Sequence, residues 1–119
     1  MIKIENISYG YKSNHPIFND ISLEIGNGIY GLLGENGVGK TTLIHLFCGL
    51  LFPWKGECSI DGMNPAKREP ALLSRYFFLP EEMQMPSESI SAFATRHSAF
   101  YPHFNYKEFE QNLEELKID

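Results

Sequence analysis

The chain has 119 residues, of which 43% are hydrophobic, and carries a formal net charge of −5 at pH 7. This length permits one domain with a modest core. Its apolar runs are too short to span a bilayer, so we expect a soluble chain. The acidic balance and the lack of a basic run argue against nucleic acid as the main partner. The N-terminus has neither a basic region nor an apolar signal core, which predicts a cytoplasmic protein.

Two segments of alternating residues begin the chain. Residues 2–7 alternate Ile with polar side chains and end in the aromatic stretch Ser8-Tyr9-Gly10-Tyr11. Residues 21–25 alternate in the same way, and Gly26-Asn27-Gly28 then supplies turn residues. Such alternation is typical of strands with one solvent-exposed face. The sequence therefore predicts a mostly antiparallel sheet in this region.

A buried strand and a helix are expected next. The nearly continuous apolar run Ile29-Tyr30-Gly31-Leu32-Leu33 is typical of a central parallel strand that is covered on both faces. From Thr41 to about Leu51, apolar residues recur at helical spacing. These residues are Leu43, Ile44, Leu46, Phe47, Leu50 and Leu51.

A glycine-rich motif joins these two elements and fits G-x-x-x-x-G-K-[ST] at every fixed position: Gly34-Glu35-Asn36-Gly37-Val38-Gly39-Lys40-Thr41. This is the pattern of a phosphate-binding loop. Unpaired N–H groups and a partial positive charge at the helix start favour an anion. The glycines let the backbone approach phosphates, Lys40 can reach the β- and γ-phosphates, and the Thr41 hydroxyl can ligate Mg²⁺. The alternative is a Gly-rich turn that only caps a helix.

Shorter elements follow the helix. Pro70 can begin a short helix over residues 70–74. The apolar run Tyr76-Phe77-Phe78-Leu79 has strand length, and we expect it beside the central strand. Cys48 and Cys58 lack C-x-x-C spacing, which favours buried, reduced thiols over a disulfide or a metal site.

From Ser87 the pattern becomes helical. Residues at spacings of three and four share one mostly apolar face: Ile90, Phe93, Ala94, His97 and Tyr101. Pro102 ends that helix, and Asn105 with Glu108 resembles a capping box that begins a second one. The apolar face of this second helix comprises Tyr106, Phe109, Leu113 and Leu116. His97 and His103 are interpreted as surface or helix-face residues, because ligands at metal-binding spacing are lacking.

Residues 2–11, 20–25 and 31–43, continued by 48–53 and 56–62, resemble the start of an ATP-binding cassette (ABC) transporter ATPase subunit. The resemblance implies an α/β fold of the ABC-type P-loop NTPases, with an N-terminal antiparallel β subdomain and the start of a helical subdomain. Residues 1–86 would form the N-terminal part of the ATPase core, and residues 87–119 would begin the helical subdomain. The segment Gly31-Leu32-Leu33-Gly34 is most similar to subunits that serve exporters.

The resemblance also implies that ATP and Mg²⁺ are bound. The cofactor-binding residues would be Tyr11, Gly34, Glu35, Asn36, Gly37, Val38, Gly39, Lys40, Thr41 and Thr42. Tyr11 would stack on adenine, for which a flat aromatic face suffices. Tyr9 is a competing candidate, since it lies two residues away on the same face, and a tyrosine that only packs on the sheet is a further alternative.

Glu81 occupies the position at which the family typically has a Gln that contacts Mg²⁺ and the attacking water. The resemblance thus implies Lys40 and Glu81 as catalytic residues and Thr41 and Glu81 as metal ligands. A carboxylate binds Mg²⁺ but cannot donate a hydrogen bond as an amide can. The alternative is a solvated loop residue, because most carboxylates are exposed.

The implied partners are a transmembrane permease subunit and a second ATPase subunit, at the inner face of the membrane. No Ser-Gly-Gly-Gln-type signature and no strand ending in Asp-Glu occurs in these residues. The resemblance therefore covers about the first half of the ATPase domain, and we expect a truncated chain that is inactive by itself. Alternatives are another P-loop enzyme, such as a small kinase or GTPase, a non-catalytic nucleotide-binding module, or a non-transport ABC protein acting on the ribosome or DNA.

Overall fold

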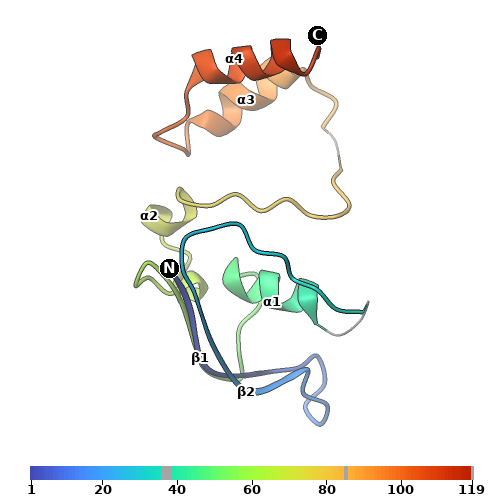
Figure 1. The fold of residues 1–119 in the computed structure, drawn as a ribbon, viewed down its shortest axis with the longest axis vertical. Coiled ribbons are helices and arrows are strands. Elements are labelled where there is room, and N and C mark those ends of the chain that lie inside the picture. Colours follow the sequence, from blue (N-terminus) through green and yellow to red (C-terminus); the bar gives the residue numbers. More distant parts are fainter. Residues whose placement is uncertain (36–38, 85, 119) are drawn as a thin grey trace. The chain divides into compact units, whose positions relative to one another are not determined.

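The computed structural model describes residues 1–35, 39–84 and 86–118, which belong to two units, Met1–Phe78 and Leu79–Asp119 (Figure 1). The first unit contains a three-stranded antiparallel sheet in the order β2-β1-β3. Its strands are β1 (Ile2–Tyr9), β2 (Phe18–Ile25) and β3 (Lys55–Ile60). The antiparallel sheet predicted near the N-terminus is confirmed. The domain boundary predicted after residue 86 stays a prediction.

A bulge in β1 brings the apolar side chains of this strand to one face. The pairing of β1 with β2 shifts in register between Ile4 and Ile7, and both residues are buried. Their odd spacing would send them to opposite faces of a regular strand. Asn6 lies between them in a left-handed conformation with φ of 50°, and this bulge brings Ile4 and Ile7 to the same face. The side-chain amide of Asn6 donates to Asp20 Oδ1 at 2.8 Å.

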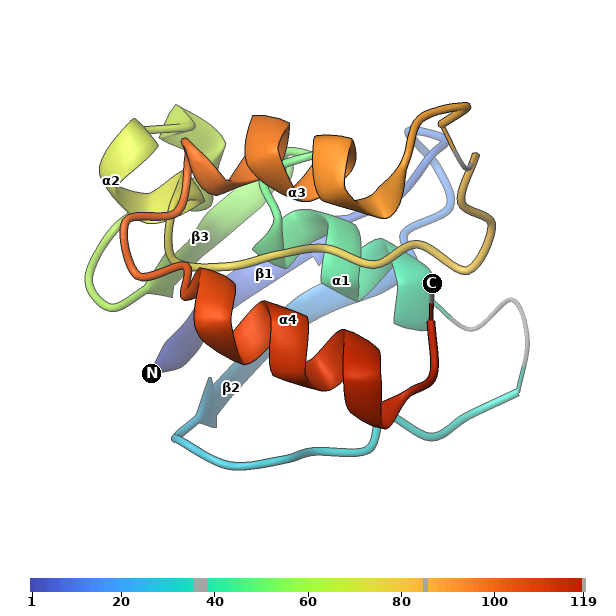
Figure 2. The same cartoon turned by 90° about the horizontal axis from the view of Figure 1, so that it is seen from above.

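Helix α1 (Lys40–Phe47) packs on this apolar face of the sheet, and Figure 2 shows it lying across the strands. The buried core cluster comprises Ile4, Ile7 and Tyr9 of β1, Leu43 and Leu46 of α1, and Cys58 of β3. Burying a leucine side chain typically contributes about 1.5–3 kcal/mol. This packing therefore determines where the N-terminus of α1 lies.

The helix ends at Phe47, earlier than the predicted Leu51. Gly49 has φ of 67°, a left-handed conformation that glycine adopts without steric cost. The Gly49 N–H donates to Leu46 O at 3.2 Å and the Leu50 N–H to His45 O at 2.9 Å, which is a Schellman motif. The apolar residues beyond Phe47 therefore continue the hydrophobic pattern without continuing the helix.

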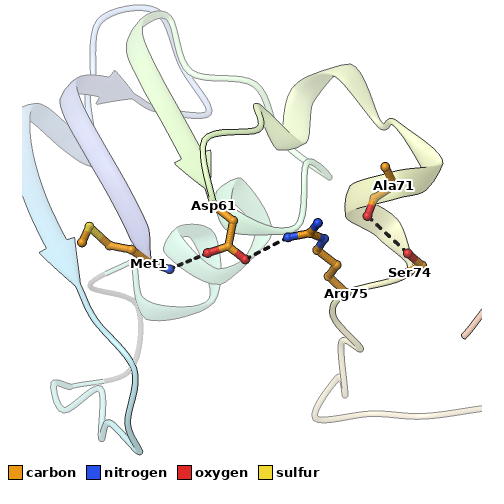
Figure 3. A network of polar contacts seen from close by, with 5 residues as sticks. All are labelled: Met1, Asp61, Ala71, Ser74 and Arg75. Carbon is orange, nitrogen blue, oxygen red and sulfur yellow. Dashed lines mark hydrogen bonds and ion pairs between the residues drawn. The ribbon is translucent and has the colours of Figure 1, made fainter. Parts of the chain in front are cut away.

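Two short helices follow β3, a 3₁₀ turn η1 (Pro65–Lys67) and α2 (Pro70–Leu73), the second of which was predicted. A polar network links this region to the start of β1 (Figure 3). The Asp61 carboxylate accepts from the N-terminal amine of Met1 at 2.7 Å and lies 3.5 Å from the Arg75 guanidinium. The amine, more than the guanidinium, lowers the pKa of the Asp61 carboxyl.

The predicted strands at residues 29–33 and 76–79 are wrong, since neither segment belongs to a strand. A parallel strand requires hydrogen-bonding neighbours, and no strand within the described residues pairs with either segment. Ile29 and Leu33 are almost fully exposed. Phe78 packs edge-on against His45 of α1 instead, with ring centroids 5.5 Å apart. An apolar run alone does not make a strand.

The second unit contains the two predicted amphipathic helices. Ser89 caps α3 (Ile90–Ser98) by accepting a backbone N–H at 3.1 Å. Asn105 caps α4 (Tyr106–Glu115) by accepting the Glu108 N–H at 3.2 Å, as the capping pattern predicts. Among the helices of residues 1–35, 39–84 and 86–118, none has the length and apolar character needed to cross a membrane.

We predict that Gly49→Ala destabilises the protein more than Gly62→Ala does. Both glycines have positive φ, but an alanine Cβ at position 49 would lie 2.8 Å from the carbonyl carbon of Pro65, whereas position 62 is open. The conformational strain alone is about 1 kcal/mol, and the clash should add about 1–2 kcal/mol at position 49. Urea denaturation of the two variants measures the difference. Equal losses of stability would show that Pro65 moves away freely.

Candidate functional site

The glycine-rich motif ends at the N-terminus of α1, as its sequence predicts. Gly34, Glu35 and the residues from Gly39 onward are described, whereas Asn36, Gly37 and Val38 lie outside the described residues. Gly34 and Glu35 are exposed, and Lys40 and Thr41 form the first turn of α1. The helix therefore begins directly at the part of the motif that carries its fixed polar residues.

Gly39 begins α1 without a side-chain cap. It is the N-cap residue, with φ of 99°, and no side chain caps the helix by a hydrogen bond. A Cβ at this position would lie 2.6 Å from Ile17 Cγ2 and 3.0 Å from Phe18 Cζ, so only glycine fits here. The first turn contains no acidic residue. Its backbone N–H groups and the helix dipole are thus suited to a phosphate.

Lys40 folds back over the motif. Its ammonium donates a hydrogen bond to the backbone carbonyl of Gly34. This contact keeps the positive charge beside the loop that the sequence predicts to surround phosphates. An incoming phosphate oxygen would be a stronger partner for the ammonium than a neutral carbonyl, because charge-assisted hydrogen bonds are about twice as strong.

The two threonines of the first turn differ in their surroundings. Thr42 is only 5% exposed, and its hydroxyl lies 2.9 Å from the hydroxyl of Tyr11. Thr41 is exposed. The Thr41 hydroxyl is a hard oxygen donor of the kind that Mg²⁺ accepts. Among the described residues there is no cluster of three His, Cys, Asp or Glu side chains that could hold a metal. The Thr41 hydroxyl fits Mg²⁺ as a ligand, because Mg²⁺ often uses only one or two protein ligands together with substrate phosphates.

The two candidate tyrosines for stacking also differ in exposure. Tyr9 is 7% exposed and part of the core, and burial raises the pKa of its phenol. Tyr11 is 63% exposed, and its hydroxyl contacts Thr42 in the phosphate-binding motif. The two rings meet edge-on with centroids 5.4 Å apart. A planar base can reach the face of an exposed ring, so the geometry favours Tyr11 over Tyr9.

The second unit contains three further residues considered in the sequence analysis, Glu81, His97 and His103. Glu81 is exposed and belongs to the second unit, so its predicted role at the metal stays a prediction. His97 stacks on Phe93 with centroids 3.9 Å apart, in line with a helix-face residue, and His103 is exposed.

Cys48 and Cys58 are buried free thiols, as predicted. Burial, and to a lesser extent the neighbouring Cys48, raises the pKa of Cys58 to about 11. A thiol that stays protonated at neutral pH is a poor nucleophile and metal ligand. The two cysteines therefore serve packing.

Sequence reasoning missed two features of the site. One is the hydrogen bond between Tyr11 and Thr42, which are 31 residues apart. The other is Trp54, whose ring lies 6.2 Å from that of Tyr9. The motif pattern contains no signal for either contact, because the first depends on how α1 packs beside the end of β1 and the second on how β1 pairs with the start of β3. The presence of a single tryptophan in the chain was the one available hint.

A glycine-rich motif followed by a lysine and a threonine at the start of a helix is the defining feature of the P-loop nucleotide-binding proteins. A family model described as ABC transporter matches residues 18–119. The chain therefore belongs to the ABC transporter family.

Individual relatives agree with the family. The chain is 40% identical over 75 residues to an ABC transporter ATP-binding protein of Pyrococcus furiosus, covering 63% of this chain and 29% of the relative. It is 31% identical over 125 residues to the phosphonates import ATP-binding protein PhnC of Wolinella succinogenes, covering 93% of this chain and 46% of PhnC. The chain thus spans less than half the length of these relatives.

A solved structure of the ATP-binding subunit of an ABC transporter has the same fold. Its TM-score with this chain is 0.78, at 23% sequence identity, over 95% of this chain and 47% of that subunit. The likeness extends over both the sheet with α1 and the later helices, since nearly the whole chain is covered. The fold predicted from the sequence is confirmed.

We predict that Tyr11→Ala weakens ATP binding by the full-length protein by roughly five- to a hundredfold, the usual effect of losing one stacked base. Tyr11→Trp should keep the affinity, because stacking requires the ring and not the hydroxyl. Calorimetric titration of both variants, with Tyr9→Ala for comparison, measures this. A larger loss of affinity in Tyr9→Ala than in Tyr11→Ala would transfer the assignment to Tyr9.

Proposed function

We propose that this chain binds Mg·ATP as part of the ATPase subunit of an ABC transporter. The observation that carries the proposal is the start of α1, where a glycine N-cap without a side-chain cap precedes a lysine and two threonines, and where the Thr42 hydroxyl contacts that of the exposed Tyr11. Phosphates would bind the N–H groups of the first turn, and adenine would stack on Tyr11. Family membership supports the same assignment.

Each residue of the site would have a distinct task. The Lys40 ammonium would leave the Gly34 carbonyl and hold the β- and γ-phosphate oxygens, and the exposed Thr41 hydroxyl would ligate the metal. Thr42 would keep Tyr11 at the start of the helix through their shared hydrogen bond. Bound Mg²⁺ would neutralise charge on the phosphates during phosphoryl transfer. Glu81 is proposed as a second oxygen ligand in place of an amide.

Hydrolysis and transport are proposed for the full-length protein, in a dimer of ATPase subunits at the cytoplasmic face of a permease. Turnover requires groups that position water and stabilise charge around the γ-phosphate, and the 119 residues alone are proposed not to supply them. Export rests on the segment Gly31-Leu32-Leu33-Gly34 alone and stays a prediction, since one relative is named as an import protein. Co-purification with a membrane subunit would separate a transporter from an ABC protein that acts on the ribosome or DNA.

We expect Lys40→Ala to weaken ATP binding by the full-length protein by roughly ten- to a hundredfold. The lysine would make charge-assisted contacts with phosphate, which typically contribute about 1.5–3 kcal/mol. Isothermal titration calorimetry measures the affinity, and Lys67→Ala, which removes an exposed lysine of η1, serves as the matched control. Unchanged affinity in Lys40→Ala would overturn the proposed function.

For Glu81→Gln we expect a changed dependence of ATP binding on Mg²⁺. Binding without metal should stay the same or become slightly tighter, because a negative charge near the phosphates is removed. A Mg²⁺ titration at constant ATP measures the effect, and Glu82→Gln is the neighbouring control. If the titrations of Glu81→Gln and the unmodified protein coincide, Glu81 is a solvated loop residue.

A further inference from the structure

We propose that Trp54 is a positioning residue for the nucleotide base, because its indole holds the segment Tyr9-Gly10-Tyr11 against the sheet and thereby orients the ring of Tyr11. The inference rests on the proposed function, since it concerns the base side of the same nucleotide site. Three contacts support it, one with the backbone of β1, one with Gly10 and one with Tyr9.

The backbone of Trp54 is anchored beside the end of β1. Its N–H donates to Ser8 O at 2.8 Å, directly before β3 begins at Lys55, which pairs with Ser8. The indole therefore extends from a residue that is hydrogen-bonded to the strand leading into the Tyr9-Gly10-Tyr11 segment. The indole can restrain this segment only if the ring packs against the segment.

The indole does pack against the segment at Gly10. A Cβ at Gly10 would lie 2.9 Å from Trp54 Cη2 and 2.5 Å from His15 O, so the ring and the following turn enclose the Gly10 backbone. Gly10 is buried although Trp54 itself remains partly exposed. Because Gly10 directly precedes Tyr11, restraint of the Gly10 backbone limits the directions in which the Tyr11 side chain can point.

Tyr9 connects the indole with Tyr11. Its ring lies 6.2 Å from that of Trp54, at an angle of 43°, and 5.4 Å from that of Tyr11, at 82°. Both distances are within the range of favourable aromatic contacts. Tyr9 is also held by its carbonyl, which accepts the Ile17 N–H at 2.7 Å. The three rings thus form a continuous row from Trp54 to the exposed Tyr11.

Tyr11 needs such support because it is largely exposed. Its hydroxyl is tied to Thr42 at one end, while the ring is backed by Tyr9 at the other. Loss of Trp54 would free the Gly10 backbone and the outer side of Tyr9, so that Tyr11 samples more orientations. The effect should reach the base and leave the phosphates alone, since the Trp54 contacts named above involve only Ser8, Tyr9 and Gly10.

The test compares two ligands of the full-length protein by calorimetry, Mg·ATP and magnesium tripolyphosphate, which lacks the base. Trp54→Ala should lower the affinity for ATP by roughly two- to tenfold, the range for the loss of an aromatic pair, and leave the tripolyphosphate affinity unchanged. Trp54→Phe should restore ATP binding. Gly10→Ala, whose Cβ would press on the indole and on His15 O and so displace the same segment, should reproduce the selective loss.

A double-mutant cycle separates positioning from direct contact. In a Tyr11→Ala background, Trp54→Ala should cause no further loss of ATP affinity, because the residue it orients is gone. A further loss there, or an equal loss for both ligands, would overturn the inference. Phe52→Ala, which removes an exposed aromatic side chain two residues away, should change neither affinity.

The same measurements distinguish this inference from the proposed function. If Lys40→Ala loses affinity for both ligands while Trp54→Ala behaves like the unmodified protein, the nucleotide site stands and the role of Trp54 is refuted. If the unmodified protein binds neither ligand, the proposed function fails and the inference fails with it.

Discussion

The packing of α1 on the antiparallel sheet is the interaction on which the site depends. An isolated helix of eight residues would not be stable in water, so α1 exists because Leu43 and Leu46 are buried against β1. Its N-terminus can then remain uncapped and free of acidic residues without loss of the helix. Burial of the apolar face of α1 thus maintains the partial positive charge of the backbone at its N-terminus, where Lys40 and Thr41 lie.

The proposed base and phosphate parts of the site come from different elements and meet through one side-chain contact. Tyr11 follows β1 and Thr42 belongs to α1, and the 2.9 Å contact between their hydroxyls joins the two. Removing the base partner should therefore change ATP affinity more than it changes the affinity for a bare polyphosphate. In the proposed site, the row of rings from Trp54 through Tyr9 would restrain the orientation of the exposed Tyr11.

Residues 29–33 illustrate the limit of local patterns. Their apolar character agrees with a buried strand, but a strand is stable only when its N–H and C=O groups pair with a neighbour and its side chains are covered. Within the described residues the segment has no strand partner, and Ile29 and Leu33 stay exposed. Residues 76–79 likewise lie outside every strand of the described residues, and Phe78 packs on His45 of α1.

The sequence by itself determined the features that depend on a few neighbouring residues: the phosphate-binding motif, the start of α2 at Pro70, the Asn105 cap of α4, and the alternation of β1. Backbone preferences and hydrogen bonds within one or two turns decide these. Only the tertiary structure decided where α1 ends, how the bulge at Asn6 aligns Ile4 with Ile7, and which tyrosine is exposed. These features arise from contacts between segments far apart in the chain, and their energies do not appear in any local pattern.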